Sequence, residues 1–475
     1  MSAGPPLDFI PPHLDGRVLR AARWLLPLWL RHQSRIGTIT VNHSGRLTAA
    51  IERFEAGTSR LLLAFRHPSI DDPAVMAHLL WTRHGRHAQF LYDRGIPLWA
   101  GKTIGWLFSR LGGISIQRGK LDLPALRTAR ELLLHGAYPF AIAPEGATNG
   151  HNELVSSLEP GIAQLSFWTA AALTSSGRTE QVEILPIGLQ YYYEVPVWGA
   201  IESLLSQLEN NAGLSPPPPE SNPQPEQLYG RLLRLGETIL ELLENFYRQA
   251  YRQPVQAQDD GFAYGGQAEA EAVPSGPNSG EDHLPISGRV ERLLDTALGV
   301  LERSFGLEPR GNLVERCRRL EQAGWERIYP PSPPPSEGVV CPLRLGLADR
   351  LAEETERRMW HMRMVEAFVA VKGTYVRERP SQERFADTLL LLWDTDCRIR
   401  GGNPAERPRL GKRRAVISID NPIVMSEWME KYRVDRRRAV ADLTAKLQHD
   451  LEALITPSGT GVAAGVANVE IHSRT

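Results

Sequence analysis

The stretch RLLLAFRHPSIDDPAVMAHLLWTRHG, residues 60 to 85, decides the fold. It begins with LLLAF at 61–65, a short apolar run that predicts a buried strand, and ends with AVMAHLLWTRHG, whose apolar spacing predicts a helix. Pro73 suits the first position of that helix, and Asp72 suits its N-cap. A buried strand that leads directly into a helix is the repeating unit of an α/β fold.

The same alternation continues on the carboxyl side of this stretch. Further strands are predicted at AQFLY (88–92), GISI (113–116), YPFAIA (138–143) and QVEILPIGLQYYY (181–193). Helices are predicted between them at WAGKTIGWLFSRL (99–111), PALRTARELLLHG (124–136) and GIAQLSFWTAAALTSSG (161–177). We therefore expect an α/β fold with a largely parallel mixed sheet flanked by helices.

The composition changes after residue 205. SPPPPESNPQPE at 215–226 and a stretch rich in Gly, Pro, Ser and acidic residues at 254–288 indicate flexible linkers, and helical patterns run between and after them to about residue 400. A strand-like KRRAVISID at 412–420 and an amphipathic pattern at 434–455 then restore the α/β character. We expect three parts: 1–205, the first part of the α/β domain; 206–410, a mostly helical insert; and 411–475, the closing strand and helix with a flexible tail.

The charge is distributed unevenly along the chain. Residues 1 to 136 contain 18 Lys and Arg against 9 Asp and Glu, although the net charge of the whole chain is only -1. A basic region suits anionic lipid head groups or phosphates. Nucleic acid is not expected as a partner, because no zinc-finger spacing, RNP-like string or Arg/Lys-rich arm accompanies the charge.

The N-terminal region contains the longest apolar stretch, RVLRAARWLLPLWLRHQSR at 17–35. Only seven uncharged residues separate Arg23 from Arg31, whereas a membrane span requires roughly 20. Its Arg residues and Trp24 and Trp29 suit a helix that lies on a membrane surface, and an ordinary helix packed on the domain remains the alternative. With three widely spaced Cys and no secretory signal, we expect a cytoplasmic protein that associates with membranes peripherally.

His67 and Asp72 are the candidate catalytic residues. They stand at the two ends of one strand-to-helix turn, so their side chains are expected to lie close together. His is the side chain whose pKa suits general base catalysis at neutral pH, and a carboxylate beside it holds the imidazole in one tautomer. Such a pair can activate the hydroxyl of a substrate. Asp71 breaks this spacing and is expected to tolerate substitution.

Two later strings carry candidate binding residues. In GGISIQRGK (112–120), Arg118 follows a predicted strand, where its guanidinium can bind a phosphate bidentately with help from Lys120. In APEGATNG (143–150), Glu145 is a candidate acceptor for a substrate hydroxyl, and Gly146 allows close approach of the backbone to a ligand. Thr148 is a weaker candidate at the same turn. Tyr191, Tyr192 and Tyr193 are assigned no role.

Taken in order, RHPSIDD, GGISIQR, APEGATNG and ILPIGLQY resemble four blocks of the glycerolipid acyltransferase family, the PlsC-like 1-acylglycerol-3-phosphate acyltransferases. The resemblance covers about residues 60 to 190, and KRRAVISIDNPI is similar to the closing elements of that family. Arg66 replaces the usual Asn, Ala143 replaces Phe, and 147–149 replace Thr-Arg-Ser. These departures leave the acceptor open, and the 206–410 insert has no counterpart in small members of the family.

The resemblance implies an enzyme of phospholipid synthesis. It would move a fatty acyl group from acyl-CoA or acyl carrier protein to a 1-acylglycerol-3-phosphate-like acceptor, at an anionic membrane surface, with no metal and no other cofactor. Glycerol 3-phosphate or another lysophospholipid is the alternative acceptor. Two other classes stay open: a catalytically silent lipid-binding scaffold, and a metal phosphohydrolase suggested by His449 and Asp450. A serine esterase is disfavoured because the chain has no G-x-S-x-G motif.

Overall fold

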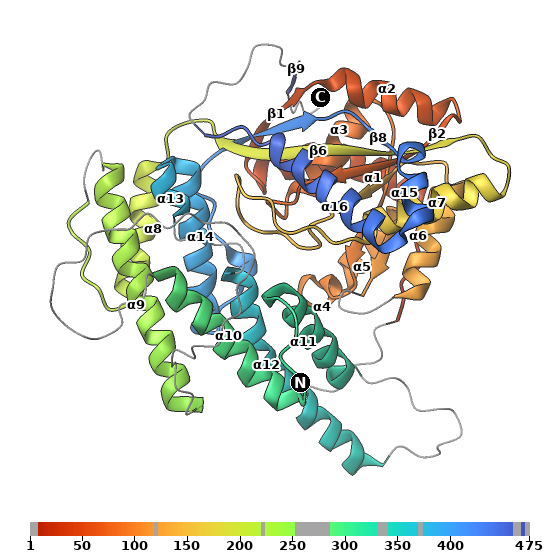
Figure 1. Cartoon of the computed structure of the whole chain (residues 1–475). Helices are drawn as coiled ribbons and strands as arrows, with labels where there is room; N and C mark the ends of the chain where they lie inside the picture. Colours follow the sequence, from red (N-terminus) through yellow and green to blue (C-terminus); the bar gives the residue numbers. More distant parts are fainter. Residues whose placement is uncertain are drawn as a thin grey trace.

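The computed structural model describes residues 8–117, 122–219, 224–251, 286–329, 341–368, 374–458 and 467–470. An α/β domain and a group of helices lie side by side (Figure 1). The described strands are β1 (Ile36–Asn42), β2 (Ser59–Phe65), β3 (Gln89–Asp93), β4 (Gly113–Ile116), β5 (Phe140–Ile142), β6 (Gln181–Tyr193), β7 (Arg413–Ile419), β8 (Ile423–Val424) and β9 (Ala467–Glu470).

The helices of the α/β domain are α1 (Gly16–His32), α2 (Ser44–Glu55), α3 (Asp72–Arg83), α4 (Ile96–Ala100), α5 (Lys102–Arg110), α6 (Leu123–His135), α7 (Gly161–Ser175), α15 (Met429–Val434) and α16 (Arg436–Ala453). The helices of the other part are α8 (Trp198–Asn211), α9 (Pro225–Tyr251), α10 (Ile286–Phe305), α11 (Leu313–Ile328), α12 (Pro342–Phe368), α13 (Tyr375–Glu378) and α14 (Gln382–Ile399).

The described strands form one sheet in the order β4-β3-β5-β2-β6-β7-β1-β9, with β8 paired to β6. β4, β3, β5, β2 and β6 run parallel to one another, whereas β7 runs antiparallel to β6 and parallel to β1. β8 is antiparallel to β6, and β9 is antiparallel to β1. The predicted fold class, a largely parallel mixed sheet flanked by helices, is confirmed.

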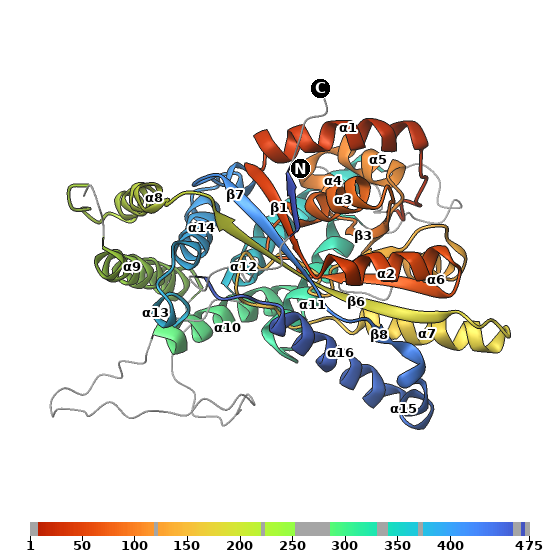
Figure 2. The same cartoon turned by 90° about the horizontal axis from the view of Figure 1, so that it is seen from above.

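Each face of the sheet has its own apolar core. Along β2, Leu61 and Leu63 point to a cluster that includes residues of α1, α2 and α3, while Leu62 and Ala64 point to a cluster formed with α6, α7 and α16. Figure 2 shows α1, α2 and α3 on one side of the sheet and α7 and α16 on the other. A strand buried on both faces is nearly all apolar, which is why LLLAF is recognisable in the sequence.

The last part of the chain completes the middle of the sheet. β7 lies between β6 and β1, with Leu189 opposite Ile417 and Ile39 opposite Ala415. The sheet is therefore built from residues on both sides of the helical part.

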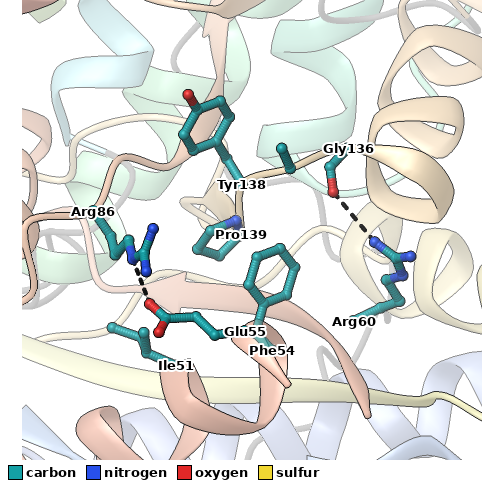
Figure 3. A pocket seen from close by; sticks show the side chains of 9 residues that line it. Ile51, Phe54, Glu55, Arg60, Arg86, Gly136, Tyr138 and Pro139 are labelled. Atoms are coloured by element: carbon teal, nitrogen blue, oxygen red, sulfur yellow. Dashed lines mark hydrogen bonds and ion pairs between the residues drawn. The ribbon is translucent and has the colours of Figure 1, made fainter. Parts of the chain in front are cut away.

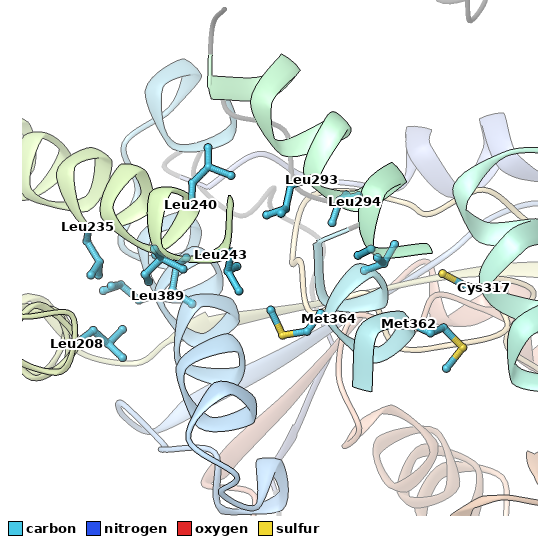
Figure 4. Close-up of a cluster of buried hydrophobic side chains, with 14 of the residues drawn as sticks. Leu208, Leu235, Leu240, Leu243, Leu293, Leu294, Cys317, Met362, Met364 and Leu389 are labelled. Carbon is cyan, nitrogen blue, oxygen red and sulfur yellow. The ribbon is translucent and has the colours of Figure 1, made fainter. Parts of the chain in front are cut away.

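The helical part has a separate core of its own. Residues of α8 to α14 share one apolar cluster that begins at Val197, and Figure 4 shows part of it. α8 already belongs to this cluster, although the sequence places the start of the insert at 206. The limits at 205 and 410 stay predictions.

Two local predictions from the sequence were wrong. α3 begins at Asp72, one residue early, so Asp71 takes the N-cap position, and its side chain makes no capping hydrogen bond. The predicted helix at 99–111 is two helices, α4 and α5, because Gly101 between them has a positive φ of 93° that a helix interior does not allow.

Within the ranges that the structure describes, no helix is both long enough and apolar enough to cross a membrane.

Candidate active site

The candidate site lies where the parallel strands end. The carboxyl ends of β2, β3, β4 and β5 meet at one edge of the sheet, which is where ligands bind in open α/β folds. His67 follows β2, and Glu145 follows β5. β6 continues beyond β2 at this edge, since Phe65 at the end of β2 pairs with Ile187 while β6 runs on to Tyr193.

His67 and Asp72 are in direct contact. The Nδ1 atom of His67 lies 2.9 Å from Oδ2 of Asp72. The Asp72 carboxylate is fully buried, whereas 18% of the His67 side chain is exposed. Because Nδ1 is bonded to the carboxylate, Nε2 is the ring nitrogen left for a substrate. The predicted proximity of the two side chains is thus confirmed.

Two further groups hold the Asp72 carboxylate. The Ser69 backbone N–H donates to Oδ2 at 2.8 Å, and the Tyr191 hydroxyl donates to Oδ1. Tyr191 lies on β6 and is buried. The sequence assigned it no role. In the sequence, only its position directly after the strand block ILPIGLQ could have drawn attention to Tyr191. Whether its hydroxyl reaches Asp72 depends on the register between β2 and β6.

Burial sets the electrostatics of this group. Loss of water raises the pKa of Asp72, and the hydrogen bonds from His67, Tyr191 and Ser69 act in the opposite direction. Burial and the nearby charge of Asp72 also raise the pKa of the Tyr191 phenol well above its usual value. Tyr191 therefore keeps its proton and acts as a hydrogen-bond donor to Asp72.

Asp71 occupies a different environment from its neighbour. Burial alone would raise its pKa, but Arg413 and Arg409 hold the pKa below its usual value. The carboxylate accepts hydrogen bonds from Arg409 at 2.8 Å, from Arg413 at 2.6 Å and from the Ser34 hydroxyl at 2.8 Å. Asp71 thus ties the turn to the start of β1 and to the closing segment. The sequence alone predicted a mild effect for substitution of Asp71. Because its carboxylate is buried between two guanidinium groups, we instead expect a loss of stability.

Arg66, one of the residues that depart from the family pattern, is completely buried. Its guanidinium donates only to backbone carbonyl groups: His151 at 2.9 Å, Asn152 at 2.8 Å, Leu154 at 2.6 Å and Leu189 at 3.2 Å. A charge buried in this way requires such hydrogen bonds. Arg66 therefore exposes no surface to a ligand and organises the segment that follows Glu145.

Glu145 is also largely enclosed by protein groups. Its Oε1 accepts the backbone N–H of His67 at 2.7 Å, and its Oε2 accepts Nδ2 of Asn149 and the N–H of Ser156, both at 2.8 Å. With 3% of the residue exposed, these contacts support a positioning role. Direct binding of a substrate hydroxyl by Glu145 stays a prediction.

Gly146 is required by the backbone of the turn after β5, whereas Thr148 is an exposed residue beside it. Gly146 has a positive φ of 72°, and a Cβ there would lie 1.9 Å from Oε1 of Glu159, so the turn itself requires glycine. Its N–H donates to the Ala143 carbonyl at 3.1 Å and is not available to a ligand oxyanion. Thr148 is exposed and directly follows this turn. A binding role for either residue stays a prediction.

Arg118 and Lys120 lie outside the described residues. The residues that flank them are fixed at the same sheet edge: Oδ2 of Asp122 accepts the N–H of Gln117 at 2.9 Å and also pairs with Arg94. The phosphate-binding role of Arg118 and the supporting role of Lys120 stay predictions.

A pocket of about 290 Å³ lies elsewhere, at the opposite edge of the sheet (Figure 3). Its lining residues precede the strands: Arg60 stands at the start of β2, and Gly136 to Pro139 lead into β5. Its cations already have partners, since Arg86 pairs with Glu55 and Arg60 donates to the Gly136 carbonyl at 3.2 Å. It contains no candidate catalytic residue.

The metal alternative rests on His449 and Asp450 of α16. Asp450 is paired with Lys446 on the same helix. In the part of the chain that the structure describes, no three His, Cys, Asp or Glu side chains are grouped so that they could hold a metal ion.

The comparisons with known proteins decide the class of the site. Residues 41–190 match the family model described as Acyltransferase. The protein is an acyltransferase. The match starts at the end of β1 and ends on β6, so this acyltransferase carries its family block on β2 to β6, with His67 and Asp72 inside it. The resemblance inferred from four sequence blocks is confirmed. No curated protein matched the chain in a sequence search.

Proposed function

We propose that this acyltransferase esterifies a 1-acylglycerol-3-phosphate-like acceptor, with His67 as general base and Asp72 as the residue that orients it. The contact between Nδ1 of His67 and the buried Asp72 carboxylate is the observation that carries the proposal. A partly exposed imidazole, bonded on one side to a buried carboxylate, is the arrangement that general base catalysis requires.

The reaction needs two proton transfers through His67 and the exchange of a thioester bond for an oxygen ester bond. The acceptor hydroxyl attacks the thioester carbonyl carbon of acyl-CoA or acyl carrier protein, while Nε2 of His67 takes the hydroxyl proton. The tetrahedral intermediate then expels the thiolate, and the imidazolium returns the proton to sulfur. Asp72 stabilises the imidazolium, and no covalent acyl-enzyme forms because the substrate itself supplies the nucleophile.

Acyl transfer with labelled donors tests this proposal. Acyl-CoA and acyl carrier protein would each be tried with 1-acylglycerol 3-phosphate, glycerol 3-phosphate and a lysophospholipid. We expect His67→Ala to lower turnover by at least about 10²-fold while the protein stays folded. His449→Ala, on an outer helix, is the matched control and should leave turnover unchanged. Normal turnover by folded His67→Ala would exclude the mechanism.

Recognition of the acceptor phosphate is proposed for Arg118. Its loss in Arg118→Ala should cost about 1.5 to 3 kcal/mol of charge-assisted binding, or roughly 10- to 150-fold in kcat/KM for a phosphorylated acceptor. Arg118→Lys should recover only part of this, because Lys lacks the bidentate geometry. A raised KM for the acyl donor alone would place Arg118 in the donor site. Glycerol 3-phosphate stays the alternative acceptor.

We also propose that α1 rests on an anionic membrane surface. Trp24 and Trp29 are 66% and 42% exposed, and Leu25 and Leu28 beside them are exposed as well. Aromatic and apolar side chains among Arg residues suit the lipid interface. Binding to anionic vesicles should weaken at high salt, since surface charges are screened over about 8 Å at physiological ionic strength. Retention after high salt and an alkaline wash would contradict peripheral binding.

A further inference from the structure

The segment 151–154 is held from two sides. On one side it is bound by Arg66, whose guanidinium donates to the carbonyl groups of His151, Asn152 and Leu154. On the other side it faces the helical insert. An Asn side chain at this position would offer only two N–H donors and could not make this set of hydrogen bonds.

The insert supplies three residues to this segment. Oδ2 of Asp387, on α14, accepts the Asn152 N–H at 2.8 Å and the Tyr375 hydroxyl at 2.9 Å. The Tyr375 hydroxyl in turn accepts the Glu153 N–H at 3.3 Å. Arg384 donates to Oε2 of Glu153 at 3.0 Å and stacks over the Tyr375 ring at 4.5 Å. The contacts thus join α13 and α14 to the segment through both backbone and side chains.

The segment also touches the catalytic groups. Oδ1 of Asn152 accepts the backbone N–H of Tyr191 at 2.6 Å, next to the phenol that bonds Asp72. Asn149, just before the segment, donates its N–H to the His67 carbonyl at 3.3 Å and its side-chain amide to the Leu154 carbonyl at 2.7 Å. Hydrogen bonds at both ends of the segment, joined by its own backbone, therefore connect the insert to the His67 carbonyl.

We propose that the insert is a working part of the active site: Tyr375, Arg384 and Asp387 are positioning residues that press 151–153 against Arg66 and so fix the backbone of His67 and Tyr191. This inference rests on the proposed function of His67. An active site loses up to about 10²-fold in rate when a catalytic group moves by 1 Å, so a loosened segment should act on kcat. Binding of the acyl donor should change little.

Two variants of the whole protein test the proposal. Asp387→Ala removes the acceptor of two hydrogen bonds, and Tyr375→Phe removes only the hydroxyl at the centre of the contact. Asp396→Ala is the matched control, because Asp396 lies on the same helix but bonds Arg400 and Asn211, away from the segment. Two quantities are measured: kcat and KM of acyl transfer, and hydrogen exchange of the backbone amides of 145–156.

We expect Asp387→Ala and Tyr375→Phe to speed exchange in 145–156 and to lower kcat by about 10- to 100-fold, with less than a twofold change in the KM for the donor. Asp387→Asn, which still accepts the Asn152 N–H, should recover part of the rate. Unchanged exchange and kcat in Tyr375→Phe, or an equal loss in Asp396→Ala, would overturn the inference. The His67→Ala result is independent of all these variants, so failure of the proposed function is recognised separately.

Discussion

The α/β domain and the helical insert each contain a polar cluster around a histidine. The two clusters differ in the partners of the imidazole and in its exposure. His67 bonds Asp72 through Nδ1 and is partly exposed. His361 of the insert is buried, with Nδ1 2.7 Å from the Tyr247 hydroxyl and Nε2 3.0 Å from the Tyr251 hydroxyl. His361 has no nitrogen left for a substrate.

The two imidazoles also have different kinds of partner. Burial lowers the pKa of His361 to about 4, so the imidazole is neutral at pH 7 and does not take part in proton transfer. His67 contacts the buried carboxyl group of Asp72, the arrangement that stabilises an imidazolium during proton transfer. The comparison teaches that catalysis depends on a free ring nitrogen and a buried carboxylate, whereas a histidine bonded on both sides only stabilises the fold.

The largest expected effect is the loss of turnover when Asp72 of the α/β cluster is substituted. Asp72→Asn keeps the shape but favours the wrong imidazole tautomer, so kcat should fall by about 10³- to 10⁴-fold. His361→Phe in the insert should lower the free energy of unfolding by about 1 to 3 kcal/mol, because the Tyr247 and Tyr251 hydroxyls lose their hydrogen bonds to the imidazole. Its kcat per folded molecule should not change. Turnover assays and urea unfolding of both variants check this, and a rate loss in His361→Phe would remove the contrast.

Asp71 is also an aspartate and is adjacent to Asp72, but we expect it to contribute to the stability of the fold and not to the chemical step. Its carboxylate is fully buried between Arg409 and Arg413, so Asp71→Asn should lower the free energy of unfolding by about 3 kcal/mol. The residual rate at saturating substrate, per folded molecule, should exceed that of Asp72→Asn. Denaturant unfolding gives the first quantity, and active-site-normalised turnover gives the second. A stable but inactive Asp71→Asn would mean that the catalytic pair is misassigned.

Tyr191 and Tyr192 are neighbours on β6, but only the Tyr191 hydroxyl bonds the catalytic pair, so they can be compared directly. Tyr191→Phe removes a hydrogen bond to Asp72 worth about 1.5 kcal/mol, so kcat should fall about tenfold. The pKa of Asp72 should rise further, which moves the acidic limb of the kcat/KM profile to higher pH. Tyr192→Phe is the control, since its hydroxyl donates to the Thr456 carbonyl at 2.8 Å. Identical pH profiles for wild type and Tyr191→Phe would contradict the role of Tyr191.

The smallest expected effect concerns Asp387 and pH. Burial raises the pKa of Asp387 to about 7, although hydrogen bonds from Asn152 and Tyr375 and the charge of Arg407 oppose the rise, while Glu153 adds to it. A raised carboxyl pKa means that the folded protein binds more protons than the unfolded chain between pH about 4 and about 7. The free energy of unfolding should therefore fall as pH rises through this window. Asp387→Asn should remove this part of the slope in urea titrations, and an unchanged slope would refute the assignment.

The sequence predicted what depends on neighbours along the chain. His67 and Asp72 are five residues apart on one strand-to-helix turn, so their contact follows from local structure. The buried strand β2 and the strand GISI were also predicted from local sequence, because each is an apolar run too short for a helix.

Contacts across the sheet and with the insert could not be predicted. Tyr191 reaches Asp72 from 119 residues away, and only the register of β2 against β6 brings it there. Asp387 bonds Asn152 across 235 residues, and the partners of Asp71 come from both ends of the domain. The helical pattern of α14 indicates a helix but not which of its faces meets the α/β domain.

A double-mutant cycle on His67 and Asp72 tests the central claim most directly. Residues that act as one catalytic unit have effects that do not multiply, because removing either one already disables the pair. Turnover of His67→Ala, Asp72→Asn and the double variant would be measured with the preferred acceptor at saturating acyl donor. We expect the double variant to be no slower than His67→Ala by more than about twofold. Rate losses that multiply in the double variant would show that the two residues act independently and would contradict the account.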